Sequence, residues 1–146
     1  MGVERYLDYK KENYWEVSDV DHVIDTLGAS EFDRELSVLK KGGRLVSLRT
    51  GPNKESAVRN NYHFIKKALF SLAGAKYDKA ARKEGKEYRF MFVRASGRQL
   101  RDITEIVEKN HIVPAVDPHI FTIEQANEAL ELVAHGHTDG KVIIQM

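Results

Sequence analysis

The chain has 146 residues, of which 42% are hydrophobic and 31% charged, a composition typical of a single globular domain. The charges of its 23 basic and 22 acidic residues almost cancel. The chain therefore lacks the strong positive charge by which basic proteins bind nucleic acid or anionic membranes. There is no cysteine, which excludes disulfides and thiolate zinc sites within this stretch, and without an apolar leader or a membrane-length apolar run we expect a cytoplasmic location.

Short apolar runs alternate with amphipathic stretches in the first third of the chain. The pattern predicts strands at residues 5–9, 22–26 and 44–48, the second of them mostly apolar, as buried parallel strands are. Ser30 is expected to cap a helix that carries Phe32, Leu36 and Leu39 on one face, and residues 40–43 (Lys-Lys-Gly-Gly) are expected to end it. Strand, helix and strand then form a right-handed βαβ unit.

The middle of the chain continues the same alternation. We expect a polar loop at residues 50–61 and a helix at residues 62–75. Residues 76–86, basic and alanine-rich, are interpreted as a frayed helix or a mobile excursion rather than a nucleic-acid patch. Residues 88–93 (Tyr-Arg-Phe-Met-Phe-Val) predict a strand.

Two capping boxes organise the last third of the chain. Ser96 with Gln99 opens a helix that Asn110 ends, and residues 122–125 open a second helix that Gly136 ends. Residues 141–145 predict a closing strand. The sequence shows neither an internal repeat nor a linker, so the predicted fold class is α/β.

Six phrases in this order resemble the second half of the medium-chain dehydrogenase/reductase family. They span nearly the whole chain and lie at residues 2–9, 23–28, 39–46, 96–100, 121–129 and 140–144. The run from Tyr88 to Leu100 and the absence of cysteine most resemble the zinc-independent quinone-oxidoreductase branch.

This resemblance implies an incomplete Rossmann-type parallel sheet. The family's first strand leads into a glycine-rich loop that holds the cofactor pyrophosphate, and none of the ten glycines here forms a G-x-G pair. The first strands and the glycine loop are therefore expected to be missing. Residues 1–95 are expected to be the second half of the dinucleotide-binding domain. Residues 96–146 are expected to be return helices and a closing strand that run toward an absent catalytic lobe, without an independent second domain.

A sheet without its central strand has an unpaired edge. In the strand order 3-2-1-4-5-6, the strand at residues 23–26 normally pairs with a strand that this chain lacks. An apolar parallel edge is costly to expose. We therefore expect a shifted first strand, a disordered N-terminus or a homodimer that covers the gap.

The resemblance also implies which residues contact cofactor. Tyr9 is expected near the adenosine 2′-phosphate, and Lys141, after Gly140, over the pyrophosphate. The remaining expected contacts are Thr26, Leu27 and Gly28 beside the ribose, Leu48, Arg49 and Thr50 near the nicotinamide, and Phe92 and Val93 on the nicotinamide side. Arg49 stands where the family usually has glycine. For every one of these residues, ordinary strand-end packing or surface exposure is the alternative interpretation.

The resemblance predicts a fragment of an NADPH-dependent reductase, with NADH as the alternative cofactor, that transfers hydride to a quinone, enone or related carbonyl-conjugated compound. No catalytic residue is nominated, because the cofactor carries the chemistry. His135 and His137 lack further ligands at a recognisable spacing, so no metal site is expected. Two alternatives stay open: a relative of zinc-dependent alcohol dehydrogenases, and a non-catalytic α/β module that self-associates. The isolated fragment is expected to be inactive.

Overall fold

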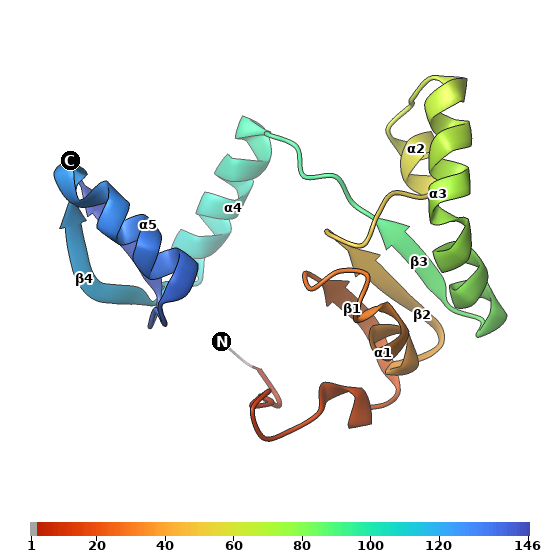
Figure 1. Ribbon diagram of the computed structural model, residues 1–146, viewed down its shortest axis with the longest axis horizontal. Coiled ribbons are helices and arrows are strands. Elements are labelled where there is room, and N and C mark those ends of the chain that lie inside the picture. The colour runs from red at the N-terminus through yellow and green to blue at the C-terminus, as the bar shows by residue number, and fades with distance from the viewer. Residues whose placement is uncertain (1–2) are drawn as a thin grey trace. The chain divides into compact units, whose positions relative to one another are not determined.

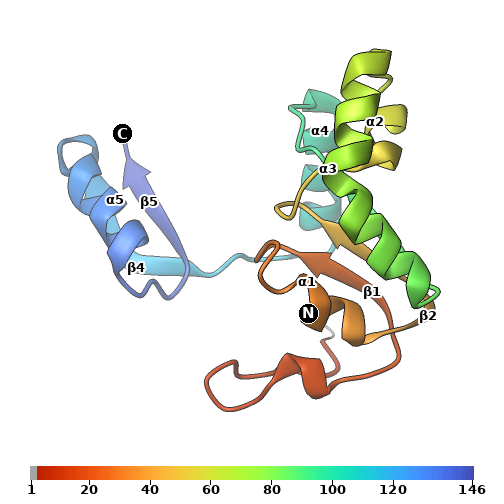
Figure 2. The same ribbon diagram turned by 45° about the vertical axis from the view of Figure 1, so that its right-hand side comes forward.

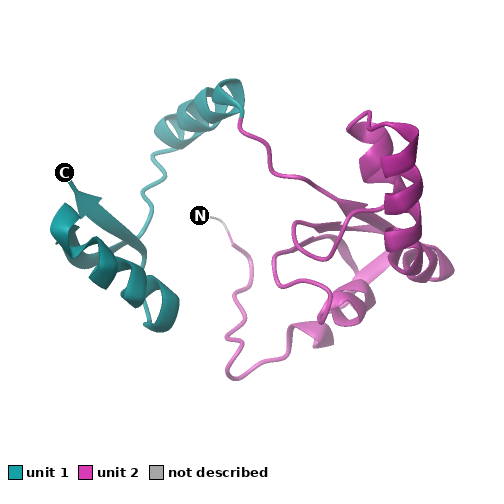
Figure 3. Cartoon of the chain, turned by 45° about the horizontal axis from the view of Figure 1, so that its top comes forward, with its two compact units in different colours: residues 1, 96–146 teal, residues 2–95 magenta. Residues whose placement is uncertain are grey.

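The computed structural model describes residues 3–146 (Figure 1). The chain divides into two compact units, residues 3–95 and residues 96–146 (Figure 3). In the described part of the chain, no helix is both long enough and apolar enough to cross a membrane. Each unit has its own parallel sheet, which confirms the predicted α/β class.

The first unit contains a three-stranded parallel sheet. Its strands β1 (Val20–Asp25), β2 (Leu39–Ser47) and β3 (Glu87–Phe90) lie in the order β1-β2-β3 (Figure 1). Val23 pairs with Leu45, and Leu45 pairs with Tyr88. Because all the strands are parallel, their carboxyl ends meet at one edge of the sheet. This arrangement confirms a partial Rossmann-like sheet.

Helices pack on one face of this sheet. The helices are α1 (Phe32–Ser37), α2 (Lys54–Arg59) and α3 (Phe64–Lys83), with a 3₁₀ turn, η1 (Tyr14–Glu16), before β1. The buried core is formed by Phe32, Leu36, Leu39, Leu45, Tyr77, Ala81, Tyr88 and Phe90. The rings of Phe32 and Tyr77 lie 4.8 Å apart between centroids, which joins α1 to α3 across the sheet face.

The other face of the sheet is far less covered. Alternate residues of each strand point to it, and Ile24 is 72% exposed there. Glu87 pairs there with Arg44 of the adjacent strand β2 and with Arg89 of its own strand β3. Ion pairs of this kind suit a surface in contact with water, whereas parallel sheets are ordinarily buried on both faces.

The expected strand at residues 5–9 is wrong. The segment has no strand, Tyr6 and Tyr9 are about 80% exposed, and the Asp8 carbonyl accepts hydrogen bonds from the amides of Lys11 and Glu12 instead. The physical reason is that a strand needs a hydrogen-bonded neighbour, and β1 pairs only with β2 in the described chain. β1 is therefore an edge strand, and the dimer that would cover it stays a prediction.

Three boundaries also differ from expectation. α1 ends at Ser37, and residues 40–43, expected to end that helix, belong to β2; there the amide of Gly42 donates to the carbonyl of Gly85 at 2.7 Å. α3 runs on to Lys83, because Tyr77 and Ala81 in the supposedly frayed stretch are buried. The expected loop at residues 50–61 contains α2, which Asn53 caps.

The second unit is a βαβ arrangement preceded by a helix. It contains α4 (Gly97–Lys109), β4 (Val116–Thr122), the 3₁₀ turn η2 (Ile123–Gln125), α5 (Ala126–His135) and β5 (Lys141–Gln145). Figure 2 shows α5 beside the parallel pair β4-β5. The predicted starts at Ser96 and Thr122, the ends at Asn110 and Gly136, and the closing strand are confirmed.

Little of this second unit is buried. Asp117 and Ala129 are its buried residues. Apolar side chains of all its elements are exposed, among them Leu100, Ile103, Ile120, Leu130 and Val133. The βαβ hydrogen bonding therefore forms without a closed apolar core.

Candidate functional site

The carboxyl ends of β1 and β2 are joined by one buried carboxylate. Asp25, the last residue of β1, accepts hydrogen bonds from the amides of Leu27 and Gly28, both at 2.7 Å. Its other oxygen accepts from Ser47 Oγ at 2.5 Å and from Thr50 Oγ1 at 2.7 Å. One side chain thus fixes the turn after β1 to the turn after β2.

Ser47 completes the second turn. It is the last residue of β2, is the residue paired with Asp25 in the sheet register, and is fully buried. Its Oγ accepts from the amides of Arg49 at 3.1 Å and Thr50 at 2.8 Å. The hydroxyl therefore donates to Asp25 while it holds the backbone that follows β2.

The site is negatively charged at its base. Burial raises the pKa of Asp25, which is 0% exposed, but the hydrogen bonds from Ser47, Gly28, Thr50 and Leu27 outweigh burial, so its pKa is lowered and it is ionised at neutral pH. Glu35 of α1 lies near it and is 4% exposed. Burial, followed by the charge of Asp25, raises the pKa of Glu35 to about 7.

The two turns present a free surface at the sheet edge. Thr26, Leu27, Leu48 and Arg49 are exposed, whereas Gly28 is buried. Within residues 3–146, no acidic group forms a salt bridge with the Arg49 guanidinium, so this cation is free to bind an anion. The amides of Leu27, Gly28 and Thr50 already donate to Asp25 or Ser47. The free cation of Arg49 is therefore the group that suits binding of a phosphate, and the surface that the two turns present offers no group for proton transfer.

Two further expected cofactor residues, Phe92 and Val93, follow the carboxyl end of β3 at the same edge of the sheet. Phe92 packs with aromatic rings of Tyr62, Phe70 and Phe90, with centroids 4.9 to 6.1 Å apart, and Val93 is exposed after β3 has ended. Tyr9 is exposed outside any strand.

Lys141 belongs to the second unit, where it begins β5 and its amide donates to the Ala115 carbonyl at 2.9 Å. The preceding Gly140 allows the backbone of Ala115 to approach: a Cβ there would lie 2.5 Å from the Ala115 carbonyl carbon. Gly140 therefore lets the backbone before β5 pack closely against the backbone before β4.

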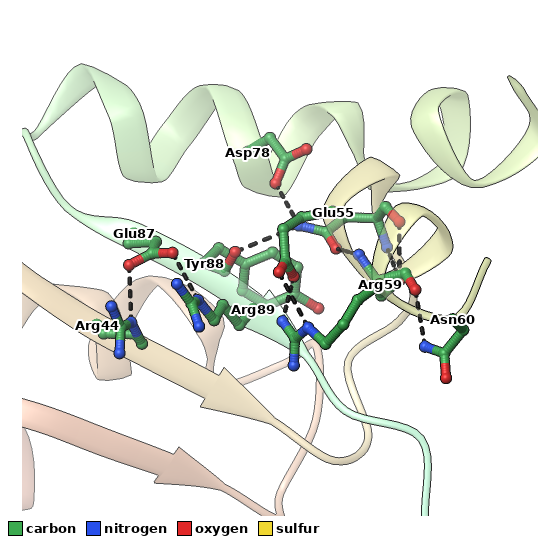
Figure 4. A network of polar contacts seen from close by, with 10 residues as sticks. Arg44, Glu55, Arg59, Asn60, Asp78, Glu87, Tyr88 and Arg89 are labelled. Atoms are coloured by element: carbon green, nitrogen blue, oxygen red, sulfur yellow. Dashed lines mark hydrogen bonds and ion pairs between the residues drawn. The ribbon is translucent and has the colours of Figure 1, made fainter. Parts of the chain in front are cut away.

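A second polar network lies on α2, α3 and β3 (Figure 4). Asn53 accepts from the amide of Ser56 and donates to Asp78 Oδ1 at 2.7 Å and to the Tyr88 carbonyl at 3.2 Å. A hollow of about 400 Å³ lies beside it, and most of its charged groups are paired, among them Arg82 with Asp78 and Lys86 with Glu84. We therefore assign this network to the attachment of α2 and α3 to the sheet.

A zinc site does not fit the described residues. Among residues 3–146, no three histidine, cysteine, aspartate or glutamate side chains converge as metal ligands. His135 instead lies 3.0 Å from Glu131 on the same helix, between Nδ1 and a carboxylate oxygen.

Sequence reasoning missed Asp25, Ser47 and Glu35. An aspartate that ends an apolar run three residues before a turn glycine is a signal for Asp25. An acid between Phe32 and Leu36 on the buried face of a helix is a signal for Glu35. No sequence signal marks Ser47, because its role depends on the register of β1 against β2.

Comparison with known proteins gives a consistent family. The model of the zinc-binding dehydrogenase family matches residues 1–144. Mitochondrial NAD(P)H oxidoreductase RTN4IP1 is similar over the whole chain, at 26% identity in Danio rerio and 27% in Homo sapiens. The chain spans only 38% of the length of these relatives.

Two solved structures share the fold. Quinone oxidoreductase from Coxiella burnetii matches with a TM-score of 0.68 at 20% identity, over 99% of this chain and 39% of that one. An alcohol dehydrogenase superfamily protein from Novosphingobium aromaticivorans matches with a TM-score of 0.52 at 20% identity, over 86% of this chain and 36% of that one. At this identity the likeness concerns the fold alone.

Proposed function

Because this chain belongs to the zinc-binding dehydrogenase family, we propose that it supplies the strand-end half of a nicotinamide-nucleotide site in an NADPH-dependent oxidoreductase. The observation that carries the proposal is the pair of turns that Asp25 ties together at the carboxyl edge of a parallel sheet. Open α/β sheets bind their ligands at this edge. Support also comes from relatives named NAD(P)H oxidoreductases.

In this proposal the chain binds and orients, and it does not transfer protons. The turn at Leu27 and Gly28, whose amides are bound to Asp25, borders the ribose, and the turn from Leu48 to Thr50 borders the nicotinamide. The bound nucleotide supplies a hydride from C4 of its nicotinamide to a quinone, enone or related carbonyl-conjugated compound. The chain by itself is proposed to be inactive, since it spans 38% of its relatives. A homodimer and a cytoplasmic location also stay proposals, and the vertebrate relatives carry the word mitochondrial in their names.

Fluorescence titration tests the proposal. The 146-residue chain is titrated with NADPH and with NADH, and the emission of the bound nicotinamide is followed. We expect saturable binding with NADPH preferred. Absence of saturable binding for both nucleotides would overturn the proposal.

A matched pair of tyrosines tests the 2′-phosphate contact. Tyr9 and Tyr6 are similarly exposed, so Tyr9→Phe removes one expected donor and Tyr6→Phe is its control. Loss of one hydrogen bond to a phosphate weakens NADPH binding by about tenfold for Tyr9→Phe and leaves NADH binding unchanged. Equal effects of the two substitutions would contradict the assignment.

The exposed edge of β1 favours one second candidate, a self-association module. Ile24 is 72% exposed, and β1 pairs with β2 alone in the described chain. Sedimentation of the wild-type chain and of Ile24→Lys separates the candidates. Dimerisation that Ile24→Lys abolishes, together with no nucleotide binding, would favour the module.

A further inference from the structure

The side chain of Asp25 forms hydrogen bonds with both turns of the proposed nucleotide site. Its two oxygens offer about four acceptor positions, and four donors occupy them. Two donors come from the turn after β1, and two are the hydroxyls of Ser47 and Thr50. The distance between the two turns is therefore set by a saturated, charged hydrogen-bond centre.

Glu35 lies behind this centre on α1. It stands among the core residues of that helix, and its Oε2 is buried without a hydrogen-bond partner. No salt bridge reaches Glu35 within residues 3–146. A buried carboxyl oxygen without a partner, next to the charge of Asp25, favours the neutral form of Glu35, and a side-chain hydrogen bond with Asp25 favours it further.

We infer that Asp25 is the positioning residue of the nucleotide site and that the ionisation of Glu35 controls how firmly Asp25 holds the two turns. The inference rests on the proposed function in a single respect, namely that these turns hold the nucleotide. When Glu35 is neutral, Asp25 is the only charge in the pair and keeps its four donors. When Glu35 ionises, two like charges lie close together among buried side chains, and their repulsion loosens the contact between α1 and the two turns.

Of the titratable groups around Asp25 and Glu35 described below, Glu35 is the one whose protonation changes near neutral pH. Tyr14 of η1 and Tyr88 of β3 interact with the pair, and the pKa of each is raised, mainly by burial, so both stay neutral. Glu31, which directly precedes α1, also acts on Glu35, and its pKa is lowered, chiefly by hydrogen bonds from Tyr14 and Arg34, so it stays charged. The pKa of Glu35 itself is raised to about 7 by burial and then by Asp25.

Amide hydrogen exchange tests the inference without a nucleotide. The rates of the Leu27, Gly28 and Thr50 amides, corrected for intrinsic exchange, are measured by NMR between pH 5.5 and pH 8.5. In the wild type we expect protection to fall several-fold as the pH rises through about 7. In Glu35→Gln, which keeps the shape but cannot ionise, protection is constant. Asp33→Asn, an exposed acid on the same helix, behaves as the wild type. An identical fall in Glu35→Gln would overturn the inference.

Nucleotide titration tests the positioning role. We expect Asp25→Asn to weaken NADPH binding by about tenfold or more, because one carboxylate oxygen that accepts two bonds becomes a donor. Thr50→Val removes a single bond to Asp25 and serves if Asp25→Asn does not fold; about threefold weaker binding is expected. Asp21→Asn, an exposed acid on β1, is the control. Full binding by both Asp25→Asn and Thr50→Val would refute the positioning role.

The two experiments fail separately. If the wild-type chain binds no nucleotide, the proposed function is wrong. The amide exchange data still test whether ionisation of Glu35 loosens the two turns that Asp25 holds. If the wild type binds and its affinity is the same at pH 6 and pH 8, the proposed function stands and the pH control is refuted. Glu35→Gln should bind NADPH at pH 8 as tightly as the wild type does at pH 6.

Discussion

The side chain of Arg49 lies against Gly28. A Cβ atom placed on Gly28 would stand 3.3 Å from Arg49 Cγ and 3.4 Å from Arg49 Cδ. Gly28 also has a φ of +101°, which side chains of L-residues rarely adopt. The turn after β1 thus contacts the turn after β2 on the surface as well as through Asp25.

Replacement of this glycine should be costly for backbone reasons. We expect Gly28→Ala to lower the free energy of unfolding by about 1–3 kcal/mol, because alanine is strained at this φ. Gly42→Ala is the matched control: its φ is +83°, and a Cβ there meets nothing within 4 Å. Urea unfolding of both variants measures the difference. A similar cost for the two would show that the Arg49 side chain moves away, whereas no cost for either would contradict the strain argument.

The free guanidinium of Arg49 should serve nucleotide binding rather than folding. We expect Arg49→Ala to weaken NADPH binding by about tenfold through loss of a charge-assisted contact, with an unchanged free energy of unfolding. Arg98→Ala, an exposed arginine in α4, is the control and should bind as the wild type does. Fluorescence titration at two ionic strengths is the measurement. Unaltered affinity in Arg49→Ala would remove this residue from the site.

The sequence was a good guide to the strands that have neighbours. Apolar, β-branched or aromatic runs predicted β1 and β3 to within three residues and the end of β2 to within one, because each pairs with an adjacent strand, whereas β2 begins five residues before its predicted start. The run at residues 5–9 has the same local character and forms no strand. Strand propensity alone therefore does not form a strand where no neighbouring strand is available, since the backbone N–H and C=O groups are then satisfied by a turn or by water.

The candidate site was only half predictable. The turns after β1 and β2 followed from the rule that ligands bind at strand carboxyl ends. The hydrogen-bonded link between the two turns could not be predicted, because the register of β1 against β2, which makes Asp25 and Ser47 neighbours, is not visible in the sequence. Glu35 was missed for another reason: helical spacing places it on the face of Phe32 and Leu36, but spacing alone does not say whether its carboxyl group is solvated or buried.

Asn53 should be the polar residue on which the attachment of α2 depends. It is 1% exposed, caps α2 and bonds both Asp78 and the Tyr88 carbonyl (Figure 4). We expect Asn53→Ala to cost about 2–4 kcal/mol, and Asn53→Asp a similar amount although it retains the cap, because the new carboxylate faces Asp78.

Thermal unfolding at pH 7 and pH 4.5 separates the two Asn53 effects. The cost of Asn53→Asp should shrink at the lower pH as one of the two carboxylates gains a proton. The cost of Asn53→Ala should stay the same. A pH-independent cost of Asn53→Asp would contradict the repulsion argument.

Gly74 should tolerate no side chain. A Cβ there would lie 2.5 Å from both Cα and Cβ of Asn53, so α3 approaches the start of α2 through this glycine. We expect Gly74→Ala to destabilise the chain by about 1–3 kcal/mol through overpacking, although alanine favours helices. Gly97→Ala, where the nearest atom is 3.9 Å away, should be neutral or slightly stabilising. Urea unfolding gives both values, and equal stabilities would show that α2 and α3 separate at little cost.

The stability of the chain should fall between pH 5 and pH 8 because of Glu35. Its pKa is raised to about 7 in the folded chain, from 4.5 in the unfolded chain, so the folded state binds the proton more tightly. The stabilisation is complete below pH 4.5 and is lost as the pH rises through about 7. Its size is on the order of 2–3 kcal/mol. Urea unfolding at half-unit pH intervals measures it. In Glu35→Gln the free energy of unfolding should no longer fall over this pH range. The loss of stability in acid should remain in this variant, because it comes from protonation of Asp25, whose pKa is lowered. A wild-type chain that became more stable between pH 6 and pH 8 would contradict the assignment.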